Sequence, residues 1–219
     1  MEKLKIGYLQ VTLLAWFSEN GRKFFWRNER ASTYEVIIAE ILLQRTKAGT
    51  VERYLPSFLN QYPSWAAMGK ASEKQLSLAL RPFGLNNLKA KRLYQLNREI
   101  KKFDGNLPPT RDMVEELSLF GQYTANAFEL FVLRRPSALL DVNMARVLER
   151  FFEPRRVKDY RFDKQLIKTA SEVVEHTRSK EINWAILDYA ALVCKSKQPK
   201  CDICKLSKLC TYFKQTHTH

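Results

Sequence analysis

All four cysteines of this chain lie in one C-terminal loop, which limits the possible structures more than any other feature. Cys194, Cys201, Cys204 and Cys210 follow the spacing C-x6-C-x2-C-x5-C. Disulfides fit poorly because nothing in the sequence indicates secretion, and cytosolic thiols stay reduced. Structural zinc sites usually combine two short cysteine pairs, and only Cys201 and Cys204 form one here. The uneven spacing within a single loop therefore favours a 4Fe-4S cluster, with zinc as the alternative.

The chain is strongly basic, with 37 Lys and Arg against 23 Asp and Glu and a formal net charge of +14. Such an excess favours a polyanionic partner, and nucleic acid fits better than a membrane. The alternative is a basic surface that only keeps the protein soluble. The sequence has no apolar run of about 18 residues and no signal-peptide core after Met1, which predicts a cytoplasmic protein without a membrane partner.

Helical periodicity recurs between short turns, and strand signals are almost absent, so the sequence predicts an all-α fold. One helix is expected over residues 6–17, ended by Asn20-Gly21. Capping boxes at Ser32-x-x-Glu35 and Ser72-x-x-Gln75 should start two more helices. The first of these is apolar on nearly every side as far as about residue 47, which predicts a central, buried helix.

Three further helices carry features that the structure can test. The helix with Val51 and Leu59 contains Pro56, which a helix tolerates in its first turn or at a kink. A later helix is basic, with Lys89 among its cations and with Leu93, Leu96 and Ile100 expected to face inward. Asn143 is expected to cap the helix that follows Asp141.

Two carboxylates and one helix start are candidates for chemistry. Glu40 lies in the middle of the apolar helix, where a carboxylate needs a partner or a cavity; an ion pair with Arg45 is the simpler alternative. Asp141 precedes a helix start, where it could simply bind backbone amides. The segment Gly121 to Thr124 opens a helix after a tight turn, and such amides bind phosphate, although many helical hairpins look alike.

Taken together, these segments resemble the helix-hairpin-helix DNA glycosylases of the endonuclease III and MutY superfamily. The similarity is nearest to the archaeal thymine–DNA mismatch glycosylases related to MutY. It runs from about Trp16 to Cys210, and the segments that carry it are Phe25-Trp26-Arg27, Glu40-Ile41-Leu42-Leu43-Gln44-Arg45-Thr46, Phe83-Gly84-Leu85, Tyr123-Thr124-Ala125 and Leu140-Asp141-Val142-Asn143, followed by the cysteine loop. The resemblance implies a two-lobed fold, with residues 24–133 in one lobe and residues 1–23 plus 134–219 in a second lobe that carries the iron–sulfur loop.

The resemblance also implies a role for each catalytic candidate. Asp141 matches the aspartate that stabilises the positive charge developing on the sugar. Glu40 matches the glutamate that protonates the leaving base or handles the water. Tyr123 stands where endonuclease III has a lysine nucleophile, and without that amine the covalent lyase route is closed.

Further residues are implied to contact DNA. Gln44 and Leu85 match positions that enter the base stack when a nucleotide flips out. The alternatives are that Gln44 is an ordinary surface residue and that Leu85 is an ordinary core residue. The other implied DNA contacts are Arg45, Gly121, Gln122 and the loop lysines Lys195, Lys197 and Lys200.

Two departures from the family pattern affect these expectations. Leu119 replaces the first glycine of the hairpin, which predicts a strained backbone with positive φ there and puts the usual bound cation in doubt. We also expect no counterpart of the additional C-terminal domain by which MutY proper reads 8-oxoguanine, which weakens the expectation of adenine removal and favours thymine or uracil opposite guanine.

The sequence thus predicts a monomeric, nucleoid-associated glycosylase of base excision repair, acting on double-stranded DNA with a mismatched or damaged base. Thymine or uracil opposite guanine is the expected substrate, and the reaction should leave the strand uncut. The alternatives are adenine removal from A:G or A:8-oxoguanine, removal of a modified base, and an inactive iron–sulfur DNA-binding protein.

The cofactor prediction has a direct test. Purified protein should be yellow-brown and absorb near about 400 nm, as expected of thiolate-bound iron. Replacing Cys204 by Ser should remove the colour, whereas replacing the neighbouring Ser207 by Ala should leave it unchanged. Colourless protein that contains one zinc ion per chain would contradict the prediction.

Overall fold

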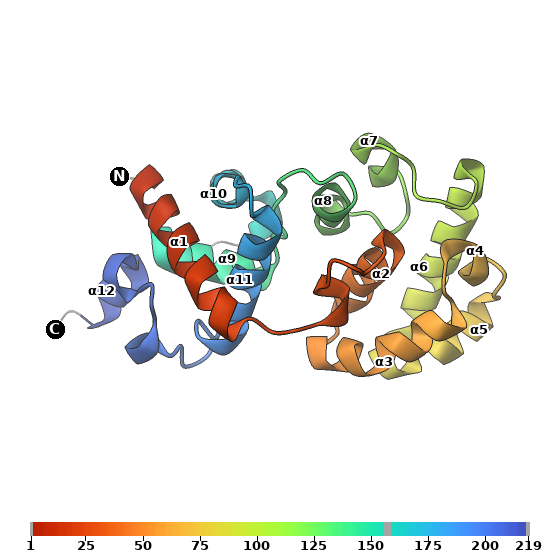
Figure 1. The fold of residues 1–219 in the computed structure, drawn as a ribbon, viewed down its shortest axis with the longest axis horizontal. Helices are drawn as coiled ribbons and strands as arrows, with labels where there is room; N and C mark the ends of the chain where they lie inside the picture. Colours follow the sequence, from red (N-terminus) through yellow and green to blue (C-terminus); the bar gives the residue numbers. More distant parts are fainter. Residues whose placement is uncertain (1, 156–158, 218–219) are drawn as a thin grey trace. The chain divides into compact units, whose positions relative to one another are not determined.

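The computed structural model describes residues 2–155 and 159–217, and every regular element within them is a helix (Figure 1). The prediction of an all-α fold is confirmed. The chain divides into two compact units. We call residues Lys23–Leu133 the continuous unit, and Met1–Arg22 together with Arg134–His219 the discontinuous unit. No helix in the described part of the chain has the length and apolar character that a membrane span requires.

The continuous unit is built around one buried helix, α2 (Thr33–Leu43), whose residues from Val36 to Leu42 are all buried. Helices α3 and α8 pack against it. The other elements of this unit are η1 (Phe25–Arg27), α3 (Ala48–Gln61), α4 (Trp65–Met68), α5 (Glu73–Ala79), η2 (Arg81–Phe83), α6 (Asn86–Glu99), η3 (Ile100–Phe103), α7 (Arg111–Glu115) and α8 (Gln122–Phe131).

Both predicted capping boxes of this unit are present. The Ser32 hydroxyl accepts the Glu35 amide, and a Glu35 carboxylate oxygen accepts the Ser32 amide at 2.7 Å. Ser72 and Gln75 make the same reciprocal pair at the start of α5. Each box satisfies amides that a helix start would otherwise leave without a partner, which is why α2 and α5 begin at these positions.

The predicted end of α2 is wrong in detail, and the structure also shows where Pro56 lies in α3. Helix α2 ends at Leu43 instead of near residue 47, because Gln44 leaves the helical region with ψ of 113° and Arg45 then adopts a left-handed conformation with φ of 57°. Pro56 lies well inside α3, beyond its first turn. The proline ring removes one backbone hydrogen bond of α3. However, Val51 and Leu55, which precede Pro56 in the same helix, are fully buried. Their packing keeps the segment helical.

The discontinuous unit places the N-terminal helix against helices from the second half of the chain. Helix α1 (Glu2–Asn20) packs on α11 and α10, and α9 packs on α10, α11 and α12 (Figure 1). The remaining elements are α9 (Val142–Phe152), η4 (Tyr160–Phe162), α10 (Lys164–Val174), α11 (Ser179–Leu192), η5 (Cys201–Ile203), η6 (Ser207–Leu209) and α12 (Thr211–His217).

Helix α1 ends at Asn20, directly before Gly21 as predicted, although it begins earlier than residue 6. The Gly21 amide donates to the Phe17 carbonyl at 2.8 Å. A Cβ at position 21 would lie 2.6 Å from that carbonyl oxygen, so only glycine fits this turn.

Buried polar side chains fix both places where the chain enters this unit. Asp188 of α11 is fully buried and accepts the Arg22 backbone amide at 2.7 Å and its guanidinium. Asn183, also fully buried, accepts the Leu139 amide at 2.7 Å and donates to the Ser137 carbonyl. Because buried polar groups must find partners, α11 determines the path of both segments.

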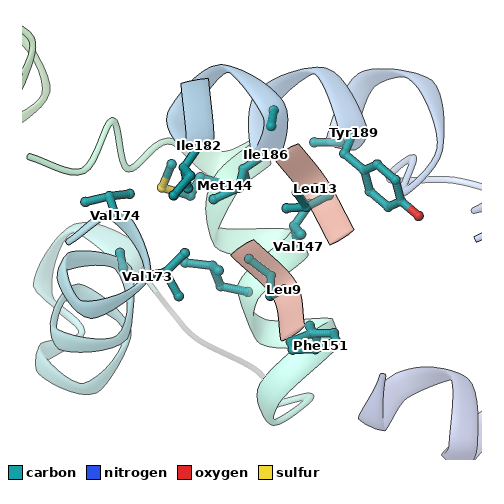
Figure 2. Close-up of a cluster of buried hydrophobic side chains, with 14 of the residues drawn as sticks. Leu9, Leu13, Met144, Val147, Phe151, Val173, Val174, Ile182, Ile186 and Tyr189 are labelled. Atoms are coloured by element: carbon teal, nitrogen blue, oxygen red, sulfur yellow. The ribbon is translucent and has the colours of Figure 1, made fainter. Parts of the chain in front are cut away.

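The hydrophobic core of the discontinuous unit predicts how shortening a side chain of α1 affects stability. Figure 2 shows Leu9 and Leu13 of α1 among the side chains of Val147, Val173 and Ile186. Leu13 is fully buried, so Leu13→Ala should lower the free energy of unfolding by about 3 kcal/mol. Val11 on the same helix is 71% exposed, and Val11→Ala should change it by less than about 0.5 kcal/mol. Urea denaturation measures both, and equal effects would contradict this account of the core.

Candidate active site and DNA interface

The structure joins two of the predicted catalytic residues, Glu40 and Tyr123. Glu40 is only 3% exposed in the middle of α2. The hydroxyl of Tyr123, in the first turn of α8, donates to Glu40 Oε2 at 2.8 Å. One partner of this buried carboxylate is therefore a phenol from a second helix. A carboxyl group held in this way can donate or accept a proton in the site.

The end of α2 also contacts the start of α8. Gln44 is the C-cap of α2, and its Nε2 donates to Thr124 Oγ1 at 2.9 Å. Arg45, the next residue, is exposed. Gly121 and Gln122, the predicted phosphate-binding residues, are also exposed at the start of α8. Three predicted DNA contacts of this unit, Arg45, Gly121 and Gln122, are therefore exposed at the end of α2 and the start of α8.

Leu85 lies at the tip of the turn before α6, where the interpretation as a core residue is wrong. It is 48% exposed. Gly84 and Leu85 both have positive φ, at 67° and 50°. A large apolar side chain on a left-handed residue is sterically unfavourable. Its exposure is what we expect of a side chain that enters a base stack.

The hairpin between α7 and α8 differs from the sequence prediction. Leu119 does not have positive φ, so the expected backbone strain at this position is absent from the described structure. Glu99 of α6 explains the turn, because its carboxylate accepts the Ser118 amide at 2.8 Å and also the Ser118 hydroxyl. Burial acts to raise the pKa of Glu99, but these bonds, together with Gln95 and Lys102, outweigh it and lower the pKa below its usual value. Leu119 and Phe120 are buried, which holds the rest of the turn.

In the discontinuous unit, Asp141 is held by three donors. Its Oδ1 accepts the backbone amides of Asn143 and Met144, each at 2.8 Å, and its Oδ2 accepts Asn143 Nδ2 at 2.6 Å. Asp141 is therefore the N-cap of α9, and the prediction that Asn143 caps this helix is wrong. An aspartate ahead of a helix start reaches the second and third amides, which leaves Asn143 free to orient the carboxylate.

The cysteine loop is attached to α9 and α11 by hydrogen bonds. Arg146 Nε donates to the Cys194 carbonyl at 2.9 Å. Arg150 donates to the Lys195 carbonyl at 2.7 Å and to Cys194 Sγ at 3.5 Å. The Tyr189 hydroxyl donates to Cys204 Sγ at 3.3 Å. The lysines Lys195, Lys197 and Lys200 of this loop are exposed.

The four cysteine thiols are free and suit an iron–sulfur cluster in ligand type, since such clusters are held by thiolates that accept hydrogen bonds. The pKa of Cys201 is raised by burial first and then by the charges of Cys204 and Cys194, so these sulfurs lie within electrostatic range of one another. Across the described residues, however, no three Cys, His, Asp or Glu side chains gather closely enough to hold a metal ion. The cluster therefore stays a prediction.

Sequence reasoning missed Lys89. The sequence indicates only that it is one cation of a basic helix, but it is only 8% exposed, and its Nζ is surrounded by three oxygen atoms. The signal was its spacing: Lys89 stands four residues before Leu93, on the inward side of α6.

Comparison with known proteins agrees with this fold. The thymine/uracil-DNA glycosylase of Methanothermobacter thermautotrophicus is 30% identical over 94% of each chain. The adenine DNA glycosylase of Buchnera aphidicola subsp. Baizongia pistaciae is 31% identical over 91% of this chain and 56% of its own length. A solved thermostable thymine-DNA glycosylase has a TM-score of 0.89 at 29% identity, covering 97% of this chain and 98% of that one.

The fold is that of the helix-hairpin-helix DNA glycosylases, and the predicted resemblance is confirmed. Residues 38–175 match the HhH-GPD superfamily of base excision DNA repair proteins. This chain belongs to that superfamily.

The Glu40–Tyr123 contact generates a prediction. Tyr123→Phe removes the hydroxyl that donates to a buried carboxylate, which should lower the free energy of unfolding by about 1 to 2 kcal/mol. Tyr54 is the control, because it is 37% exposed on α3 and no hydrogen bond of the described residues uses its hydroxyl. Tyr54→Phe should leave thermal and urea denaturation unchanged. If both variants behave like the wild type, the contact contributes nothing to stability.

Proposed function

We propose that this protein is a monofunctional DNA glycosylase of base excision repair that removes thymine or uracil mispaired with guanine. The observation that carries the proposal is Glu40, a carboxylate buried in an apolar helix and bound to Tyr123. Burying a carboxylate lowers the stability of the fold unless strong partners compensate. Proton transfer to a leaving base is a function that accounts for a carboxyl group at this place. The similarity to the thymine/uracil-DNA glycosylase over 94% of each chain supports the choice of base.

In the proposed reaction the target nucleotide leaves the base stack, and the bond between C1′ of the sugar and the base nitrogen breaks. Asp141 stabilises the positive charge that develops on the sugar, and its three donors hold the carboxylate in one orientation. Glu40 gives its proton to the departing base. Water then adds its hydroxide to C1′, and its proton returns to a carboxylate.

The reaction should stop at an abasic site. Strand cleavage by a covalent route requires an amine that forms a Schiff base with the sugar, and Tyr123 has a phenol instead. The proposed enzyme therefore leaves both strands intact until alkali breaks the abasic sugar.

We also propose a cofactor, a DNA partner and a cellular location for this enzyme. Cys194, Cys201, Cys204 and Cys210 would hold a 4Fe-4S cluster that shapes the loop and its lysines. The net charge of +14 supports binding to the phosphate backbone of double-stranded DNA. We also propose that the protein acts as a monomer associated with the nucleoid.

Adenine removal is the second candidate, favoured by the 31% identity to an adenine DNA glycosylase. A panel of end-labelled duplexes with G:T, G:U, A:G, A:8-oxoguanine and normal pairs, each read with and without alkali, separates the two. Product from G:T or G:U only after alkali is the expected result. Product from adenine mispairs alone would favour the second candidate, and product without alkali would contradict a monofunctional enzyme.

Asp141→Asn tests the role of the carboxylate. Asparagine caps helices about as well as aspartate, so the variant should fold. Its excision rate should fall at least about 100-fold, because the charge that stabilises the transition state is lost. Asp163 caps α10 in the same unit, accepting the Leu166 amide at 2.8 Å. Asp163→Asn therefore makes the same chemical change at a second helix start and should keep its activity.

DNA binding completes this test. Asp141→Asn should bind the mismatched duplex within about threefold of the wild type, since phosphate contacts dominate affinity. If wild type and variant bind equally and neither removes a base from any duplex, the protein is an inactive DNA-binding member of the superfamily.

A further inference from the structure

Lys89 holds an ammonium group in the interior of the continuous unit. Its Nζ has three N–H donors and three oxygen partners: the Leu42 carbonyl at 3.2 Å, the Phe83 carbonyl at 3.1 Å and the hydroxyl of Thr46. Burial lowers the pKa of Lys89. All three partners are neutral oxygens, so no carboxylate contact explains why a lysine occupies this place.

The three partners come from two separate turns. Leu42 and Thr46 bracket the segment that contains Gln44 and Arg45 at the end of α2. Its last carbonyls lack partners within the helix, and the helix dipole favours a cation there. Phe83 ends η2, directly before the Gly84-Leu85 turn. One ammonium therefore binds the base of both turns.

Two further hydrogen bonds complete the arrangement. The Thr46 hydroxyl donates to the Phe83 carbonyl at 2.8 Å and so joins the turns directly. The backbone amide of Lys89 donates to the Leu85 carbonyl at 2.9 Å. Lys89 thus binds both ends of the Gly84-Leu85 turn. Its Nζ donates to the carbonyl of Phe83, just before the turn, and its backbone amide donates to the carbonyl of Leu85 within it.

Both turns need such support because their backbones are strained. Arg45 and Leu85 have φ of 57° and 50°, a region that non-glycine residues adopt only where the surrounding structure enforces it. At the same time Leu85 is 48% exposed, so its own side chain adds little packing to hold the turn. The bonds from Lys89 supply the constraint at the base.

We infer that Lys89 is a positioning residue for base extrusion, which holds Gln44 and Leu85 in the geometry for entering the base stack. The inference rests on the proposed function, because it takes these two side chains as the ones that fill the space left by the flipped nucleotide. Lys89 itself need not touch DNA, and it acts through the two turns that it joins.

The test compares Lys89→Met with Lys91→Met. Methionine keeps the length of the side chain but removes the ammonium; Lys91, exposed on the same helix, is the control for the loss of one charge. The probes are the mismatched duplex from which the wild type excises a base and the same duplex with 2-aminopurine beside the mismatch. Lys89→Met should lower the single-turnover excision rate at least tenfold. The increase in 2-aminopurine fluorescence that reports base extrusion should also fall at least tenfold. Its affinity for fully paired DNA should stay within twofold of that of Lys91→Met.

A double-mutant cycle separates positioning from general destabilisation. If Lys89 acts through Leu85, then Lys89→Met combined with Leu85→Ala should extrude the base no worse than the poorer single variant. Losses that multiply would overturn the inference, as would a Lys89→Met protein with wild-type fluorescence and excision.

A further variant keeps the inference testable if Lys89→Met does not fold. Thr46→Val preserves the shape but removes the hydroxyl that links Lys89 to Phe83, and it should reduce base extrusion about threefold. Wild-type extrusion in Thr46→Val would overturn the inference. A wild-type protein that excises no base from any duplex overturns the proposed function and this inference with it, whereas an active wild type with an equally active Lys89→Met overturns the inference alone.

Discussion

Helix α2 is buried on nearly every side, and the continuous unit is arranged to satisfy the polar groups that this burial removes from water. A buried polar group without a partner costs more than most single contacts contribute, so each one must be met from a neighbouring element. The capping box at Ser32 meets the first amides, and Tyr123 meets the carboxylate of Glu40. At the other end, Lys89 meets the carbonyl of Leu42. The helices that supply these partners are therefore fixed against α2, and the candidate site forms where they meet it.

The discontinuous unit follows the same rule with other groups. Asp188 and Asn183 are fully buried on α11, and each binds the backbone of a segment through which the chain enters the unit. The second of these segments leads directly to Asp141, whose carboxylate is oriented by amides of α9 and by Asn143. A carboxylate held by several donors needs little reorganisation during a reaction, which is the property that electrostatic catalysis requires.

The sequence predictions are confirmed where the interactions involve residues close together in the chain. The capping boxes at Ser32 and Ser72 involve residues three positions apart, and the end of α1 depends on Gly21 and the turn before it, so no distant contact can change these outcomes. Local signals leave the outcome open, or predict it wrongly, where packing between helices decides. Pro56 stays within a helix because its neighbours are buried, and Leu119 avoids a left-handed conformation because Glu99, from another helix, binds the adjacent amide.

The sequence by itself determined the all-α fold, the family and the identity of Glu40 and Asp141 as the carboxylates of interest, because helix periodicity and short motifs are carried by neighbouring residues. Only the tertiary structure decided that Tyr123 is a partner of Glu40, that Leu85 is exposed and that Lys89 is buried at the base of two turns. Burial and pairing depend on residues far apart in the chain. A basic helix looks alike in sequence whether each cation faces water or faces the carbonyl groups of another helix.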